Sequence, residues 1–385
     1  MKKQIIPTIY EKNRIIDNII EAMVNYRSFL ILGHKNPDED CIASMVAFAI
    51  LLGKFDRKAG ICLGRKVHEH FQYMLNICKY NAINLYESCE QLNDSFDALV
   101  VCDTPKSSMI EKNALVEAML RAPDVLKIEI DHHIGSDSSY IGDGGYCLVT
   151  EATSSSELIL YLILKIAKKE GILREYQIKD LLSRNLVLAL LSGIIGDTNM
   201  GQFLKSRRER RYYRLFSTML NNILGATTIR ETNFANMDQV YQELQRLSGN
   251  EDRCYRYLMD RRRFSTSIGY VALDQIESWE LQNHVDEDTL VSVSRAVANE
   301  LAEKSRKLSL VAYYDRPEVS NLVQFRVRRS GSYRGYDLRE MLELFSIENG
   351  GGHEGAIGFR LQKDSITDYH DYVNRLIEGL ERVLP

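Results

Sequence analysis

Residues 28–55 read SFLILGHKNPDEDCIASMVAFAILLGKF, and this stretch decides the fold class. It begins with a short apolar run rich in β-forming residues, and a longer apolar segment with helical spacing follows. Two more short runs, DALVVCD at 97–103 and VLKIEID at 125–131, repeat the strand pattern. Strands that alternate with helical segments build βαβ units. The first half of the chain is therefore predicted to be α/β, with a mainly parallel sheet flanked by helices.

The sequence changes character after Gly201. From there to about Arg263 it is polar and helical, which indicates a connector. A new alternation follows, in which SIGYVAL, LSLVAYYD and LVQFRVRRS are typical of strands and LVSVSRAVANELAEKS of a helix. This pattern predicts a smaller α+β domain. The expected division is a first domain at 1–225, a helical connector at 226–265 and a second domain at 266–385.

Composition excludes several classes of protein. The chain has 385 residues, 45% hydrophobic and 26% charged, which is too long for one small module and too apolar for global disorder. The net charge of -4 excludes a protein that coats polyanions over its whole surface, so any phosphate-binding surface must be local. The seven cysteines show no CxxC pair and are typical of reduced, buried thiols. With no signal peptide or apolar membrane span in the sequence, we expect a cytoplasmic protein.

Each of the three short runs ends in a residue that can bind a metal, namely His34, Asp103 and Asp131. Open α/β sheets bind their ligands at the carboxyl ends of the strands, so this convergence predicts a site. The segment HKNPDED at 34–40 adds three carboxylates where a helix begins. Taken alone, that segment suits a site for a hard metal ion and an N-capping loop equally well.

The candidate ligands together offer two imidazoles and four carboxylates: His34, Asp38, Asp40, Asp103, His132 and Asp197. This set suits two borderline-hard cations, with Mn²⁺ expected and Mg²⁺ as the alternative. Two cations about 3.5 to 4 Å apart can activate a bridging hydroxide and stabilise both oxygens of an in-line displacement at phosphorus. Phosphoester hydrolysis is the reaction that this chemistry favours.

Four motifs, HKNPDEDCIAS, VCDTP, DHHIG and SGIIGDT, resemble in this order the motifs of the DHH phosphoesterases. Further along, NGGGHEGAIGF, with RVRRS before it, resembles the glycine-rich signature of the DHHA1 substrate domain. The resemblance implies an N-terminal DHH catalytic domain and a C-terminal DHHA1 domain. Cys41 departs from the family pattern, in which alanine is common at this position, and it is not an expected metal ligand.

The resemblance also implies the following site residues. One cation would be held by His34, Asp38 and Asp103, and the other by Asp40, Asp103, His132 and Asp197. Asp131 would orient the ligands, and His133 would face the scissile phosphate or the leaving group. The residues expected to bind substrate in the second domain are Arg329, Ser330, Gly350, Gly351, Gly352 and His353.

The function implied is that of a manganese-dependent phosphoesterase similar to nano-RNases and 3′-phosphoadenosine 5′-phosphate phosphatases. Its expected partners are short single-stranded RNA or small phosphorylated nucleotides and no membrane, and a homodimer is compatible with this reading. Alternatives with the same metal centre are a single-stranded DNA exonuclease, a linear dinucleotide phosphodiesterase or an exopolyphosphatase. A further alternative is a nucleotide-binding regulator without turnover. The arginine-rich stretch 207–214 suits either a guide for a nucleic-acid backbone or the solvated face of a helix.

Overall fold

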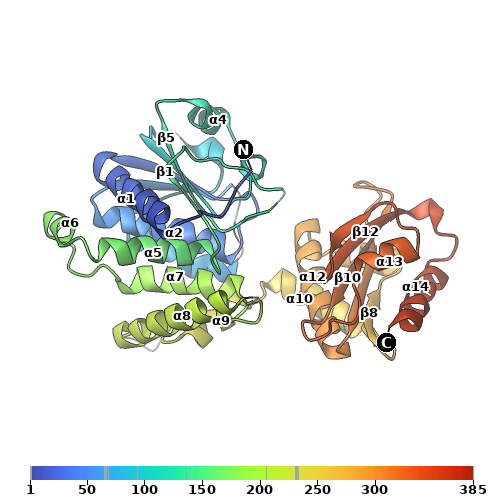
Figure 1. Ribbon diagram of the computed structural model, residues 1–385. Helices are drawn as coiled ribbons and strands as arrows, with labels where there is room; N and C mark the ends of the chain where they lie inside the picture. The colour runs from blue at the N-terminus through green and yellow to red at the C-terminus, as the bar shows by residue number, and fades with distance from the viewer. Residues whose placement is uncertain are drawn as a thin grey trace. The chain divides into compact units, whose positions relative to one another are not determined.

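The structure is a computed structural model and divides into two compact units, Met1–Arg246 and Leu247–Pro385 (Figure 1). The division falls within the segment 226–265 that the sequence suggested as a connector. The residues that the structure describes are 2–64, 67, 69–92, 94–135, 137–204, 206–229 and 234–384.

The first unit is built on a parallel sheet of six strands in the order β3-β2-β1-β4-β5-β6. The three strands expected from the sequence lie side by side at its centre. The α/β prediction with a parallel sheet is therefore confirmed, while the short outer strands had no clear sequence signal. The strands are β1 (Ser28–Leu32), β2 (Lys58–Cys62), β3 (Asn84–Tyr86), β4 (Ala98–Cys102), β5 (Leu126–Asp131) and β6 (Cys147–Val149).

Helices cover both faces of this sheet (Figure 1). Successive strand residues point to opposite faces, so Phe29 and Ile31 pack against α1, α2, α5 and α7, while Leu30 and Leu32 pack on the side of α4. The helices of the unit are α1 (Ile9–Asn25), α2 (Glu39–Lys54), α3 (Gln72–Tyr80), α4 (Ala114–Arg121), α5 (Ser155–Ile166), α6 (Glu170–Glu175), α7 (Arg184–Asp197), α8 (Arg207–Thr227) and α9 (Met237–Leu244).

Helix α2 lies at the centre of the first unit. It is buried from Asp40 to Leu52 because the sheet, α5 and α7 surround it, which explains why its sequence lacks a polar face. Asp38 caps its first turn by accepting a hydrogen bond of 3.1 Å from the Cys41 backbone N–H. The polar residues before and within the first turn are thereby held at one end of a rigid, buried helix.

The second unit contains a six-stranded sheet in the order β11-β12-β10-β9-β8-β7. The pairing of β8 with β9 is parallel and the other pairings are antiparallel, as suits an α+β unit. Helices α10, α11 and α12 pack on one face, and α13 and α14 pack on the other. The elements are α10 (Gly249–Asp260), β7 (Arg263–Phe264), β8 (Ile268–Ala272), α11 (Gln275–Gln282), α12 (Glu287–Ser305), β9 (Leu308–Tyr314), β10 (Leu322–Arg329), α13 (Arg339–Leu344), β11 (Gly350–His353), β12 (Ala356–Gln362) and α14 (Tyr369–Val383).

The arginine-rich stretch 207–214 opens helix α8 in the first unit. Its Arg208 points inward and forms an ion pair of 3.1 Å with the buried Glu157 of α5, so this arginine stabilises helix packing. The seven cysteines are free thiols. Among the helices of the described ranges, none combines the length and hydropathy needed to cross a membrane.

Candidate metal centre

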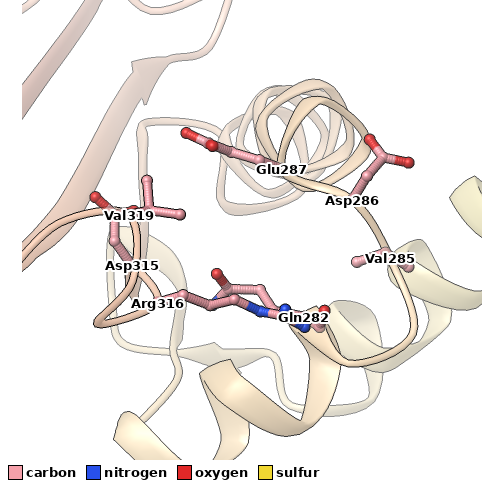
Figure 2. A pocket seen from close by; sticks show the side chains of 7 residues that line it. All are labelled: Gln282, Val285, Asp286, Glu287, Asp315, Arg316 and Val319. Atoms are coloured by element: carbon pink, nitrogen blue, oxygen red, sulfur yellow. Dashed lines mark hydrogen bonds between the residues drawn. The ribbon is translucent and has the colours of Figure 1, made fainter.

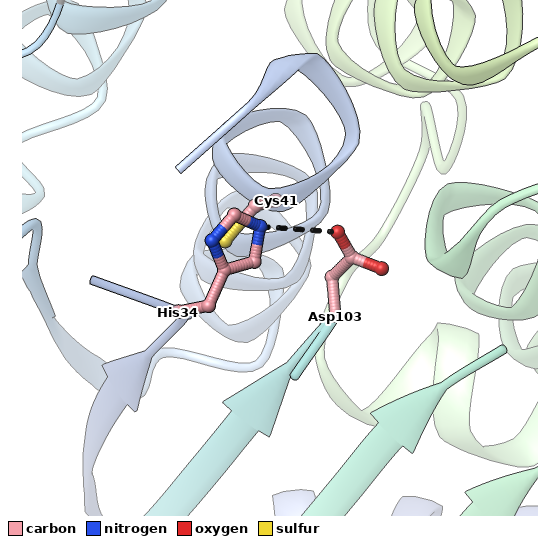
Figure 3. A group of neighbouring side chains, drawn as sticks. All are labelled: His34, Cys41 and Asp103. Carbon is pink, nitrogen blue, oxygen red and sulfur yellow. Dashed lines mark ion pairs between the residues drawn. The ribbon is translucent and has the colours of Figure 1, made fainter. Parts of the chain in front are cut away.

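Three neighbouring parallel strands bring the first candidate ligands together. His34 follows β1, Asp103 follows β4 and His132 follows β5, so all three lie at the carboxyl edge of the sheet. Asp103 lies between the two histidines. Its carboxylate oxygens are 3.8 Å from His34 Nε2 and 3.4 Å from His132 Nε2 (Figure 3 shows the pair with His34). Strand order therefore produces the convergence that the sequence suggested.

Helices α2 and α7 supply the remaining carboxylates. Asp38, the N-cap of α2, places Oδ1 3.7 Å from His34 Nε2. Asp197, the last residue of α7, places Oδ2 3.5 Å from His132 Nε2. Asp40 lies in the first turn of α2 and forms a group with His132 and Asp197 whose ligand atoms lie within 4.8 Å of one another. The structure thus brings all six predicted metal ligands into one cluster.

Asp40 is held by the N-terminus of helix α5. Its oxygens accept hydrogen bonds of 2.5 Å from the Ser155 backbone N–H and 3.0 Å from that of Ser156. These are amide groups that a helix leaves unpaired, and the helix dipole also favours a negative charge there. Gly193 of α7 is needed for the close packing, because a Cβ on it would lie 2.6 Å from Asp40 Oδ1. The first glycine of the SGIIGDT motif thus leaves room for the carboxylate.

The electrostatics of the cluster favour a cation. Burial and the charges of Asp103 and Asp197 raise the pKa of Asp40 well above its usual value. Burial, together with the charge of Asp103, also raises the pKa of Asp197 to about 6 although His132 opposes the shift. Burial would lower the pKa of His132, but the hydrogen bond and charge of Asp103 outweigh it and raise that pKa. Because carboxylates and imidazoles crowd together here, the donor set fits hard or borderline divalent cations.

Asp131 and His133 form a second layer beside the cluster. The buried Asp131 accepts a hydrogen bond of 2.8 Å from Nδ1 of His133, which is partly exposed. The ammonium of Lys3 pairs with the other oxygen of Asp131. Burial would raise the pKa of Asp131, but His133 and Lys3 lower it to about 2. Asp131 is therefore an anion that holds the His133 ring. Its predicted function of orienting the metal ligands stays a prediction.

The sequence did not identify Lys3, Ser155 and Cys41 as parts of the site. Lys3 is far from the motifs along the chain, so nothing local marked it. Ser155 donates a hydrogen bond of 3.0 Å from Oγ to Asp103. Cys41 Sγ belongs to a group of possible ligand atoms with His34 and Asp103 (Figure 3). Its position next to Asp40 in the sequence could have indicated that Cys41 lies at the site. Burial raises the pKa of this thiol, so the thiol is neutral in the absence of a cation.

The predicted substrate-binding residues lie in the second unit, and their interactions differ. Arg329 is nearly buried, donates a hydrogen bond of 2.7 Å to the Tyr336 carbonyl and pairs with Glu354 at 3.2 Å. Ser330 is buried and donates a hydrogen bond of 3.0 Å to Glu303. Gly350, Gly351 and Gly352 form most of β11, and the φ of 146° at Gly352 favours glycine. The His353 side chain lies outside the described part, so its binding function stays a prediction.

The raised pKa of Asp197 predicts a pH-dependent response to metal. We expect Mn²⁺ to raise the Tm of the metal-free protein more at pH 7 than at pH 5. The pKa of about 6 lies above the unfolded value, so the stability that this group contributes is present at low pH. It is lost as the pH rises through 6, when the ionised carboxylates repel one another and become available to a cation.

Thermal unfolding with EDTA and with Mn²⁺ at both pH values measures this effect. The Asp197→Asn variant cannot ionise and is expected to show a smaller difference between the two pH values. Equal shifts of Tm at pH 5 and pH 7 in the unmodified protein would contradict the prediction.

Comparisons with known proteins bear on the family and the fold of the chain. Residues 28–194 match the model of the DHH family, N-terminal domain. An exopolyphosphatase-related protein from Bacteroides fragilis has a similar structure, with a TM-score of 0.64, 17% identity and coverage of 96% of each chain. RecJ from Thermus thermophilus in complex with Mn²⁺ has a TM-score of only 0.43 at 14% identity, over 98% of this chain and 56% of that chain. No curated protein matches the sequence. At this identity the first structure shows a shared fold, and the second is too distant to support an argument.

Proposed function

Residues 28–194 match the model of the DHH family, N-terminal domain, and on this premise we propose that the protein is a divalent-metal-dependent phosphoesterase. Its proposed substrates are short oligoribonucleotides or small phosphorylated nucleotides. The single observation that carries the proposal is the cluster of four carboxylates and two imidazoles at the carboxyl edge of the sheet. Such a ligand set serves two cations better than one.

The ligands divide into two sets around Asp103. His34 and Asp38 lie on the β1 side, and His132, Asp40 and Asp197 lie on the β5 side. Mn²⁺ is the proposed ion at both places and Mg²⁺ the alternative. A pair of bound cations supplies the activation of water and the stabilisation of negative charge at phosphorus.

The residues of the second layer then have defined tasks in the proposed reaction. The Asp131 carboxylate accepts a hydrogen bond from His133 Nδ1, so it fixes the orientation of the ring. His133 is 40% exposed at its side chain and can exchange a proton at Nε2 with solvent or substrate. We assign to it proton donation to the leaving oxygen, which is the work of a positioned general acid. The backbone N–H groups of Ser155 and Ser156 keep Asp40 in place while charge changes nearby.

The choice of short nucleotide substrates rests on the second unit. The segment NGGGHEGAIGF resembles the signature of domains that bind the end of a nucleotide substrate, and it forms β11, the turn that follows and the start of β12. A glycine-rich edge strand lets a ligand approach the backbone closely.

A matched substrate panel tests the proposal. We expect Mn²⁺-dependent turnover of a linear RNA dinucleotide and of 3′-phosphoadenosine 5′-phosphate to exceed that of longer RNA, single-stranded DNA and polyphosphate. Initial rates at equal phosphate concentration, with EDTA as the metal-free control, measure the preference. Faster cleavage of long DNA or polyphosphate would overturn the substrate class but not the metal centre. Binding without turnover of any substrate would favour a nucleotide-binding regulator instead.

A further inference from the structure

The second unit contains arginines that have no carboxylate partner. Arg329 is engaged with Glu354 and Tyr336 and is nearly buried. By contrast, Arg326 and Arg328 of β10 and Arg295 of α12 form no ion pair with a carboxylate anywhere in the described ranges. These three guanidinium groups are the candidates for binding an external anion.

The three arginines are close enough to repel one another. Arg326 and Arg328 are two residues apart on one strand, so they lie on the same face of the sheet, towards α12. Arg326 donates a hydrogen bond of 3.3 Å to the Tyr313 hydroxyl, while its Nε is buried and has no hydrogen-bond partner. Burial and the charges of Arg326 and Arg295 lower the pKa of Arg328 to about 10. Uncompensated positive charge of this kind costs free energy that a bound anion would recover.

Glycines leave a depression beside Arg295 and Arg326, whereas Arg328 donates hydrogen bonds to the Val327 and Ile357 carbonyls. The strand register places Gly358 of β12 opposite Arg326, and Gly351 of β11 opposite Gly358. A Cβ on Gly351 would meet nothing within 4 Å, and one on Gly358 would meet only the Phe325 carbonyl at 3.6 Å. The depression has a volume of ≈ 650 Å³, in the range of small-molecule sites. We call it the arginine pocket, and the residues used here are Arg295, Arg326, Arg360, Gly351 and Gly358.

The far end of the arginine pocket is acidic. Glu287 and Asp315 line it there, and both also line a smaller depression of ≈ 180 Å³ beside it (Figure 2). Asp315 accepts hydrogen bonds of 2.6 Å from Ser320 and 2.7 Å from Gln324. These contacts fix the position of the Asp315 carboxylate. Glu287 is the first residue of helix α12. The pocket therefore offers cations at one end and hydrogen-bond acceptors at the other.

We propose that the arginine pocket binds a nucleoside phosphate, with the phosphate at Arg295 and Arg326 and the sugar or base towards Glu287 and Asp315. Guanidinium groups match phosphate oxygens in charge and geometry, and carboxylates accept hydrogen bonds from ribose hydroxyls and base amino groups. This inference rests on the proposed function only for the choice of nucleotides as ligands. The pocket shares Gly350 and Gly351 with the substrate-binding residues expected from the sequence. It uses Arg295 and Arg326 in place of Arg329 and Ser330, because those two side chains are engaged within the unit.

Calorimetric titration of the full chain in EDTA tests the inference, since hydrolysis needs metal and does not interfere. The probes are AMP, a 5′-phosphorylated ribodinucleotide, adenosine and inorganic phosphate. We expect Arg326→Gln and Arg295→Gln each to weaken nucleotide binding about 10- to 100-fold, as loss of a charge-assisted hydrogen bond does. Gly358→Val keeps every arginine but fills the depression, and it is expected to weaken binding by a similar factor.

Arg382→Gln is the matched control. Arg382 lies on α14, on the other face of the sheet, and its side chain is 80% exposed, so less than about a threefold change is expected. Arg295 is exposed on its helix, so Arg295→Gln is expected to fold normally. It therefore still tests the pocket if Arg326→Gln proves to be misfolded.

The outcomes separate this inference from the proposed function. Tighter binding of the dinucleotide than of AMP would support the inference and identify the end of an oligonucleotide as the ligand. Equal affinities for the two would support the inference and identify a free nucleotide as the ligand. Unchanged affinity in the pocket variants, or no saturable binding to the unmodified chain, would overturn it. If inorganic phosphate binds as tightly as AMP, the claim that the pocket recognises the sugar or base would be overturned. Arg326-dependent binding without hydrolysis in Mn²⁺ would overturn the proposed function alone.

Discussion

Replacing Asp103 with asparagine is expected to lower Mn²⁺-dependent hydrolysis of the RNA dinucleotide by about 10³-fold or more, since loss of a single electrostatic contact already costs about 10²–10³-fold. Asp103 is the shared member of the cluster. Its carboxylate lies 3.8 Å from His34 Nε2 and 3.4 Å from His132 Nε2, and its side chain is 2% exposed. The variant removes one charge from both sets of ligands and changes little in size.

Asparagine also preserves the backbone at this position. The φ of Asp103 is 49°, in the left-handed region where aspartate and asparagine are tolerated better than most residues. Strain of this kind is often found at functional sites. A loss of activity in the asparagine variant therefore reports the loss of charge rather than a distorted chain.

Steady-state kinetics and metal content after dialysis against Mn²⁺ measure the effect. We expect the unmodified protein to retain two ions per chain and the variant fewer. The control is Asp137→Asn, which removes a carboxylate whose side chain is 88% exposed and is expected to leave both measurements unchanged. Near-normal turnover of Asp103→Asn would refute the shared position of this carboxylate.

Replacing Lys3 with methionine is expected to destabilise the first unit by about 3–5 kcal/mol, the effect of breaking a buried ion pair from one side. The Lys3 and Glu129 side chains are both 0% exposed, and the two charges lie 2.7 Å apart. The ammonium also donates to the Thr104 carbonyl at 2.7 Å and pairs with Asp131. Methionine has a similar length and no charge, so two carboxylates would remain buried without their cation.

Urea denaturation followed by circular dichroism measures the change in the free energy of unfolding. The double variant with Glu129→Gln is expected to recover part of the loss, because one of the two unpaired charges is then absent. Lys58→Met is the matched control, since Lys58 pairs with Asp94 at 3.1 Å but its side chain is half exposed, and surface pairs contribute about 0–1 kcal/mol. Equal stability of Lys3→Met and Lys58→Met would contradict the prediction.

Much of the fold was readable from local patterns. The runs 28–34, 97–103 and 125–131 became β1, β4 and β5, because short apolar stretches of β-forming residues between helical segments have few other ways to become buried. The outer strands β3 and β6, which are three residues each, carry too little sequence to produce a pattern. Their place depends on the backbone hydrogen bonds that the central strands offer.

The candidate site was also readable in part. The six predicted metal ligands converge because each stands at the end of a strand or at a helix terminus, and the parallel sheet brings those ends to one edge. The sequence placed Asp197 at the end of an apolar run without identifying the run as a helix. In the structure it is α7, and Gly193 within it explains how that helix approaches Asp40.

By itself, then, the sequence determined the parallel α/β architecture and the residue types of the candidate metal centre, because periodicity, strand ends and motif spacing are local properties of the chain. Only the tertiary structure decided which residues pair over long separations. It joined Lys3 to Asp131, engaged Arg329 with Glu354 and left Arg326 beside two glycines without a counter-charge. Burial and charge pairing depend on neighbours brought together by folding, and no local pattern in the sequence encodes them.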